Sequence, residues 1–248
     1  MSFMLKIKAF IRFYIELAFD NKVSLIFTLL FPAIYQLINF KVVTITNTDD
    51  FIQTSMLMIA YIIVSTAING VTMSIISTRN SGYIKAYYYA SGSRWAIYLA
   101  NLFVQLIIVL LENLIFIVSL MILYRFFSVN LLLNFMLMTL ISFPFIALGF
   151  NALFLFKIRS SDLSILATAL IIGLLYLFSF TVNLSSIPNF LKIIFGINPY
   201  AFVNLILREL LHPSVVVSFN VILDCIIFSL IGFVGFQFLD LQNRGIKK

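Results

Sequence analysis

Few side chains in this sequence could carry covalent chemistry. Ser91, in the stretch Tyr89–Gly92, could act as a nucleophile only with a histidine base within hydrogen-bonding distance. His212 is the sole histidine, and the distribution of positive charge along the chain places it on the opposite side of a membrane. No two of the nine glycines have the Gly-x4-Gly-Lys-Ser/Thr spacing that binds nucleotide phosphates, and the single cysteine, Cys225, has no cysteine partner. We therefore expect no catalytic residue, metal site or nucleotide site, and a protein that is not an enzyme.

Polar residues inside apolar runs are the next candidates, because such groups are costly in a membrane and often functional. Glu112 and Asp224 could belong to a transport pathway or its gate, or could hydrogen-bond a neighbouring helix. A polar conduit with aromatic walls, or simple helix–helix hydrogen bonding, would equally explain another set of residues. This set is Phe31, Tyr35, Gln36, Asn39, Ser65 and Asn69.

The composition is that of an integral membrane protein. The 248 residues are 62% hydrophobic and 10% charged, and their mean hydropathy is +1.12. A membrane-spanning helix needs about 20 apolar residues, and six runs reach or approach this length. These runs are Val23–Phe40, Phe51–Ile76, Ala96–Tyr124, Leu131–Phe156, Leu163–Val182 and Val215–Leu239. The sequence therefore predicts an all-α membrane protein with six transmembrane helices, forming a single domain over residues 1–248.

Two segments outside these runs have their own patterns. In residues 1–20 an apolar stripe lies opposite charged residues, which predicts a helix in the membrane interface, with Arg12 and Glu16 spaced to pair. The stripe consists of Phe3, Ile7, Phe10, Ile11, Tyr14, Leu17 and Ala18. Residues 184–213 are broken by Pro188, Gly196 and Pro199, and so predict a re-entrant hairpin rather than a span.

Positive charge indicates the orientation. With the N-terminus in the cytoplasm, most of the 16 lysines and arginines fall on the cytoplasmic side. Only Lys41, Arg125, Lys192 and Arg208 then lie outside. The sequence thus predicts a multi-pass plasma-membrane protein with both termini in the cytoplasm, and its net charge of +7 needs no nucleic-acid partner.

The segment between the second and third runs is unusually polar. Gly82 and Gly92 bracket residues 83–91, long enough for two helical turns. On such a helix Tyr83, Ile84, Tyr87 and Tyr88 would share one face, suited to docking on another protein. An ordinary positively charged loop with tyrosines at headgroup depth is the alternative.

Three stretches resemble the ABC-2 type membrane subunits of ATP-binding-cassette transporters. They are FDNKVSLIFTLLFPAIYQLI at 19–38, TRNSGYIKAYYYASGSRWAIYLAN at 78–101 and SSIPNFLKIIFGINPYAFVNLILREL at 185–210. Each resembles a family feature: a charged turn before a span containing Phe-Pro, a short helix before Ser-Arg-Trp, and a proline-containing extracytoplasmic hairpin. Their order and spacing fit the family over nearly the whole chain.

The resemblance implies a permease driven by two separate ATPase subunits, which would carry the ATP and Mg²⁺, together with a second permease copy or a sister permease. It implies that the short helix couples to the ATPase through Gly82, Tyr83, Ile84, Lys85, Tyr87, Tyr88, Ser91 and Arg94. It also implies an outer gate at Pro199, Tyr200, Arg208 and Glu209, for which a simple structural cap is the alternative.

The cargo follows less directly from the sequence. The chain looks most like compact Gram-positive peptide exporters, such as those for phenol-soluble modulins, which implies export of an amphipathic toxin-like or bacteriocin-like peptide. Export of a polysaccharide, lipid-linked glycan or drug is the alternative within the family, and an ATP-independent secondary transporter or channel is the alternative outside it. The family often has Glu near the position of Arg79, and its short helix is less rich in tyrosine; both departures bear on which ATPase would fit.

Overall fold

The computed structural model describes residues 3–20, 22–40, 45, 47–156, 162–182 and 197–239. Within these residues every regular element is a helix. The order is α1 (Phe3–Asp20), α2 (Lys22–Asn39), α3 (Thr48–Ser65), η1 (Thr66–Met73), α4 (Ser74–Asn80), α5 (Tyr83–Ser91), α6 (Arg94–Tyr124), α7 (Val129–Gly149), η2 (Phe150–Leu155), α8 (Leu163–Val182), α10 (Pro199–Leu211) and α11 (Val215–Gln237). The prediction of an all-α protein is confirmed for this part of the chain.

Among the described residues, four helices are long and apolar enough to cross a membrane: Thr48–Asn80, Arg94–Tyr124, Val129–Leu155 and Ser218–Gln237. They correspond to four of the six expected spans. The other two coincide with α2 and α8, where the apolar helical stretches are shorter, at Thr28–Ile38 and Leu163–Phe178. Large apolar side chains are exposed along α2, α6, α7, α8 and α11. Exposed apolar surface on this scale is typical of helices that face lipid.

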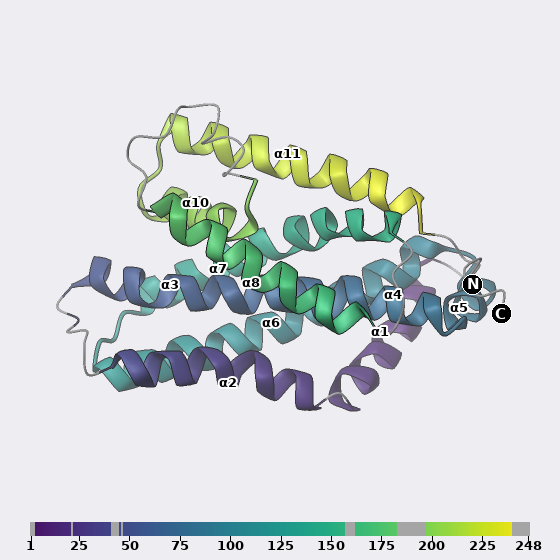
Figure 1. Ribbon diagram of the computed structural model, residues 1–248, viewed down its shortest axis with the longest axis horizontal. Helices are drawn as coiled ribbons and strands as arrows, with labels where there is room; N and C mark the ends of the chain where they lie inside the picture. Colours follow the sequence, from purple (N-terminus) through teal and green to yellow (C-terminus); the bar gives the residue numbers. More distant parts are fainter. Residues whose placement is uncertain are drawn as a thin grey trace.

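Most long helices run roughly along the long axis of the molecule, with α3 in the middle (Figure 1). Buried residues of α3 and η1 form the centre of the main hydrophobic core, and α3 contacts α2, α6, α7, α8 and α10. Helix α5 lies at one end of the bundle, here called the α5 end (Figure 1). The start of α3 and the turn between α6 and α7 lie at the opposite end (Figure 1).

Local signals in the sequence explain the helix ends. The side chains of Asn47, Ser93, Ser128 and Asn198 accept hydrogen bonds from the first turns of α3, α6, α7 and α10, as N-cap residues do. Arg125 ends α6 in the left-handed conformation at φ 54°. Only residues 125–128 separate α6 from α7, and so short a connection makes the two helices antiparallel neighbours.

Helix α11 packs closely on α7 and η2 because it has glycines at the contact. A Cβ atom at Gly232 would lie 2.5 Å from the carbonyl oxygen of Leu148, and one at Gly235 would lie 2.3 Å from that of Asn151. Both separations are shorter than any normal contact. Glycine therefore permits an approach that any other residue would prevent, as small residues commonly do between membrane helices.

The structure adds detail to three expected segments. The second run, expected at 51–76, lies within a helix from Thr48 to Asn80 whose middle part is the π-helical segment η1. The fourth run ends in the 3₁₀-helix η2 rather than in α-helix. Within the expected hairpin 184–213, residues 199–211 form the amphipathic helix α10, packed on α3, α7, α8 and α11, and residues 184–196 lie outside the described residues.

Candidate functional site

Helix α5 is bounded by two glycines in the left-handed conformation, Gly82 at φ 81° and Gly92 at φ 66°. Glycine adopts this conformation without steric cost, so the chain can turn sharply at both ends of a nine-residue helix. Ser91 is buried, and its hydroxyl donates to the Ser93 carbonyl and accepts from the Ser93 amide, at 3.1 and 3.2 Å. The serine considered above as a nucleophile therefore holds the turn into α6.

The inner face of α5 packs on α1. Ile84 is buried, and Tyr87 and Tyr88 are half-buried beside a small core of Tyr14, Ile97, Ala100 and Val104. The ring centroid of Tyr87 lies 5.8 Å from that of Phe10 and 5.2 Å from that of Phe13, both edge-on. Of the four residues expected on one docking face, Tyr83 is exposed, Ile84 is buried in the main core, and Tyr87 and Tyr88 are half-buried.

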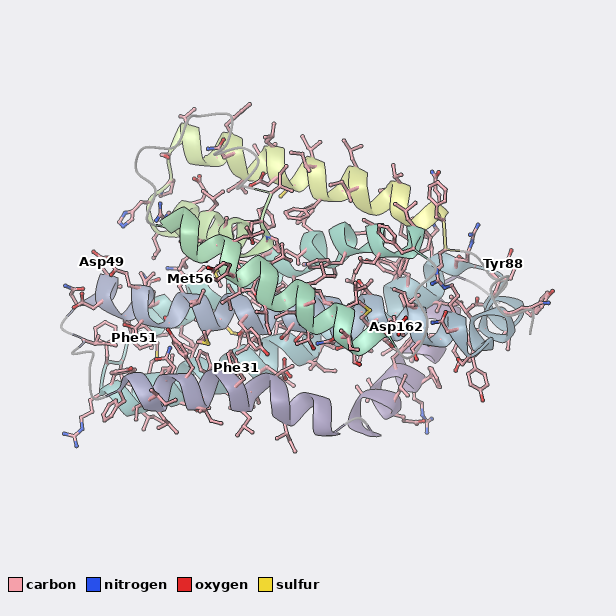
Figure 2. All side chains as sticks on the ribbon, viewed as in Figure 1. Phe31, Asp49, Phe51, Met56, Tyr88 and Asp162 are labelled. Atoms are coloured by element: carbon pink, nitrogen blue, oxygen red, sulfur yellow. The ribbon has the colours of Figure 1, made fainter. Side chains whose placement is uncertain are left out.

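The exposed surface of α5 includes Tyr83, Lys85 and Tyr89. The exposed fractions of the two tyrosines are 62% and 74%, and the Lys85 ammonium lies 6.0 Å from the centroid of the Tyr89 ring. Figure 2 shows α5 and the labelled Tyr88 at one tip of the molecule. This face could contact another protein, since exposed aromatic side chains beside a cation are common anchors at interfaces.

Helix α1 lies along α6 and supplies Phe10 and Phe13, which contact Tyr87 of α5. Tyr14 is buried, whereas Leu17, expected on the same apolar stripe, is exposed. The expected pair of Arg12 and Glu16 is confirmed, with nitrogen and oxygen 3.2 Å apart. Burial raises the pKa of the Tyr14 hydroxyl above its ordinary value of 10.0, and nearby Tyr87 raises it further. Burial, followed by nearby Tyr83, also raises the pKa of Tyr87.

Two arginines at the α5 end bind the carboxyl ends of helical segments. Arg79 is buried and donates to the carbonyl oxygens of Phe154 and Phe156, each at 3.2 Å. Arg94 donates to the carbonyl oxygen of Leu239 at 2.8 Å. Cations are favourable there because carbonyl groups at a helix C-terminus lack intrahelical donors. Both arginines thus tie distant segments together at this end.

Glu112 joins three helices in the interior. Its two carboxylate oxygens accept hydrogen bonds from the hydroxyls of Thr28 on α2, at 2.6 Å, and Thr66 on η1, at 3.1 Å. All three side chains are buried. The sequence singled out Glu112 but not its threonine partners, which are 84 and 46 residues away, and no local pattern predicts such a meeting.

Thr66 begins the π-helical segment, which is itself supported from α6. The Asn101 amide donates to the carbonyl oxygens of Gly70 and Val71, at 3.2 and 3.4 Å. A Cβ at Gly70 would lie 2.3 Å from the side-chain oxygen of Gln105. A wide π-turn lacks the ordinary i to i−4 bonds and is often found at functional positions. Asn101 and Gln105 were not predicted as functional residues.

The residues considered for a polar conduit differ in burial and in their hydrogen bonds. Gln36 is buried and donates to the Thr54 carbonyl at 2.7 Å, and Ser65 is buried and donates to the Ile62 carbonyl at 3.2 Å. Phe31 and Tyr35 are exposed on α2, and the Phe31 ring lies against that of Tyr61 on α3, with centroids 4.8 Å apart. Asn69 is half-buried, and the side chain of Asn39 lies outside the described residues.

The residues expected at an outer gate lie on α10, and most of them make structural contacts. Asn198 donates to the Leu174 carbonyl at 2.8 Å and Tyr200 to that of Ile171 at 3.3 Å, so α10 is bonded to α8. Pro199 is buried at the first turn, Arg208 is exposed, and Glu209 accepts a hydrogen bond from Ser218 on α11.

Asp224 is buried on α11, and its Oδ2 has no hydrogen-bond partner among the described residues. No group of three potential metal ligands occurs in the part of the chain that the structure describes. Comparison with known proteins finds no matching family model, no matching curated protein and no matching solved structure.

Proposed function

We propose that this chain is the membrane permease subunit of an ATP-binding-cassette exporter of the ABC-2 type, with α5 as the contact for a separate ATPase subunit. The observation that supports this most is the form of α5. It is a short helix between two left-handed glycines, with Tyr87 packed against α1 and with Tyr83 and Tyr89 exposed. The hydrophobic helices supply the membrane part of such a subunit.

A push on α5 would reach the membrane helices directly. Only Ser81 and Gly82 separate it from α4, which continues η1, and only Gly92 and Ser93 separate it from α6. Helix α6 and η1 meet again at Glu112, which also binds α2. ATP binding could shift the equilibrium between two states of the permease, because the ATPase would bind α5 more tightly in one state than in the other.

The proposed topology has six crossings with both termini in the cytoplasm. Helices α2 and α8 contain 18 and 20 residues, and at 1.5 Å per residue they are about 27 and 30 Å long, enough for a bilayer core of about 30 Å. With them counted as spans, the α5 end is cytoplasmic and α10 is extracytoplasmic.

The proposed pathway follows α2, α3 and α8, completed by a second copy or a sister permease. One open face of α8 presents Ile165, Ile172 and Tyr176 together with small residues. The exposed outer face of α2 is also mainly apolar. Apolar walls suit an amphipathic peptide as cargo, whereas a glycan would stack on the aromatic rings.

A matched pair of variants tests the ATPase contact. Tyr89 and Phe127 are equally exposed aromatic residues, at 74% and 73%, on α5 and in the α6–α7 turn at the opposite end. We expect the tagged chain, purified from its own host, to bring down an ATP-hydrolysing subunit in equal amount. Tyr89→Ala should weaken this association by about 2 kcal/mol or more, the loss typical of an exposed aromatic anchor, and Phe127→Ala should leave it unchanged.

The outcome against the proposal is equally defined. Purification without any ATPase, or equal retention of the ATPase by both variants, would exclude α5 as its contact. Insertion of each variant is checked by its yield in the membrane fraction.

Buried Glu112 and Asp224 favour a second candidate, an ion-coupled secondary transporter, because buried acids often bind ions or protons. Transport by the purified chain alone in vesicles driven by an ion gradient would favour that candidate. Transport that requires the ATPase and ATP favours the exporter.

A further inference from the structure

A hollow of about 350 Å³ lies at the α5 end, between α5, the start of α6 and the end of α11. Its volume falls within the range of about 300–1,000 Å³ found for small-ligand sites. Aromatic side chains form much of its wall: Tyr88, Trp95, Phe233 and Phe236. Ser93, Arg94 and Gln237 supply its polar groups.

Arg94 gives the hollow a fixed positive charge. Its guanidinium donates one hydrogen bond to the carbonyl of Leu239 at 2.8 Å, which restricts its position. A guanidinium has five N–H donors, so others are left for a ligand. Its planar set of donors matches a phosphate better than a lysine ammonium does.

The aromatic side chains of the wall pack on one another at the α5 end of the hydrophobic bundle. Trp95 stacks on Phe236 with ring centroids 4.0 Å apart, and it contacts Phe233 at 5.3 Å. Tryptophan and tyrosine concentrate at the level of the lipid headgroups, because their rings are apolar and their N–H or O–H groups are polar.

The hollow continues into an apolar strip along α11. Phe233, Leu230 and Ile226 have exposed side chains, and their spacing places them on one face of the helix. From Phe233 to Ile226 this strip is about 10 Å long at 1.5 Å per residue. A ligand that fits both parts has an anionic head and a hydrocarbon tail.

We infer that this hollow binds the headgroup of an anionic phospholipid, with an acyl chain lying along Phe233, Leu230 and Ile226. The phosphate would accept hydrogen bonds from Arg94, and the headgroup would lie against Trp95 and Tyr88. Because Tyr88 belongs to α5 and Phe233 to α11, the lipid would bridge the two helices. This inference goes beyond the proposed function, since lipid binding requires no ATPase.

Trp95 is the only tryptophan of the chain, so its fluorescence reports on this hollow alone. The full chain is reconstituted in phosphatidylcholine vesicles that contain a small fraction of brominated-chain lipid, a short-range quencher. We expect brominated phosphatidylglycerol to quench Trp95 at a mole fraction about tenfold lower than brominated phosphatidylcholine does. Both lipids carry the phosphate, but in phosphatidylcholine the choline cation cancels its negative charge and is repelled by Arg94.

Three variants locate the site. Arg94→Gln should abolish the preference, and Arg94→Lys should keep part of it, which separates loss of charge from misfolding. Lys8→Gln removes an exposed charge from α1 and should leave the preference intact. Equal quenching by the two lipids, or a preference that persists in Arg94→Gln, would overturn the inference. Displacement of the lipid by millimolar inorganic phosphate would also overturn it, since the ligand would then be a free anion.

Discussion

The Glu112 carboxylate on α6 accepts hydrogen bonds from α2 and from η1 in the interior. Hydrogen bonds between membrane helices contribute modestly, about 0.6 kcal/mol on average and at most about 1.7. A carboxylate oxygen left without a donor costs more than an absent bond, because it stays buried. Glu112 therefore matters chiefly through the three helices that it joins.

Thr66→Val removes the donor to one carboxylate oxygen and changes side-chain volume little. We expect it to destabilise the folded chain by about 1–2 kcal/mol, measured as a lower unfolding midpoint in detergent with Trp95 fluorescence as the signal. Thr168→Val is the control, since Thr168 is exposed on α8 and bonds back to the Ser164 carbonyl. Equal midpoints for the two variants would show that Glu112 does not need Thr66.

Tyr14 gives the contact of α1 with α6 a pH dependence. Burial raises the pKa of its hydroxyl above 10.0, so an unfolded tyrosine ionises before the buried one does. Stability from this contact is complete below pH 10 and declines as the pH rises above it. We expect the anisotropy of a label at Glu16→Cys, in a Cys225→Ser chain, to fall above about pH 10. Tyr14→Phe should remove most of that fall; an identical fall in both chains would contradict the assignment.

At the scale of elements, the fit of α11 on α7 and η2 depends on the absence of side chains. Gly235→Ala would place a methyl group 2.3 Å from the Asn151 carbonyl oxygen, and backbone cannot yield as a flexible side chain would. We expect a loss of about 1–3 kcal/mol, typical of overpacking, seen as a lower unfolding midpoint. Gly173→Ala on α8 meets no atom within 4 Å and should not lower it. Equal unfolding midpoints for the two variants would mean that α11 can move away from η2 without a loss of stability.

Periodicity and length predicted the helices well, because an apolar run of membrane length has few alternatives to a helix. The glycines around α5 and the Arg12–Glu16 pair were also readable, since both depend on residues close in sequence. Which tyrosines of α5 are buried could not be predicted from the sequence. Tyr87 turns inward only because Phe10 and Phe13, more than 70 positions earlier, lie beside it.

The same limit applies to the interior. Glu112 could be noticed as an acid in an apolar run, but its meeting with Thr28 and Thr66 depends on how α2 and α3 pack on α6. The π-turn is likewise a tertiary feature, since Asn101 of α6 binds its carbonyl groups. For Gln36 the sequence left a conduit and a helix–helix hydrogen bond equally open, and its bond to the Thr54 carbonyl is the second; Ser65 bonds within its own helix.

For the whole molecule, we propose that α5 passes movement from one end of the bundle to its centre. It is joined by two short turns to α4 and α6 and is packed on α1. Its outer tyrosines are the surface that we propose an ATPase subunit grips. If a bound ATPase subunit moved α5, then α4, η1 and α6 would move with it, and so would Glu112 and α2.

The most direct measurement of this claim is photo-cross-linking from position 89 in living cells. A photoreactive amino acid replaces Tyr89 in one strain and Phe127 in another, and the adducts are identified by mass spectrometry. The account predicts that position 89 cross-links to an ATP-hydrolysing subunit and that position 127 does not. Labelling of position 89 from outside intact cells, or no ATPase adduct at that position, would contradict it.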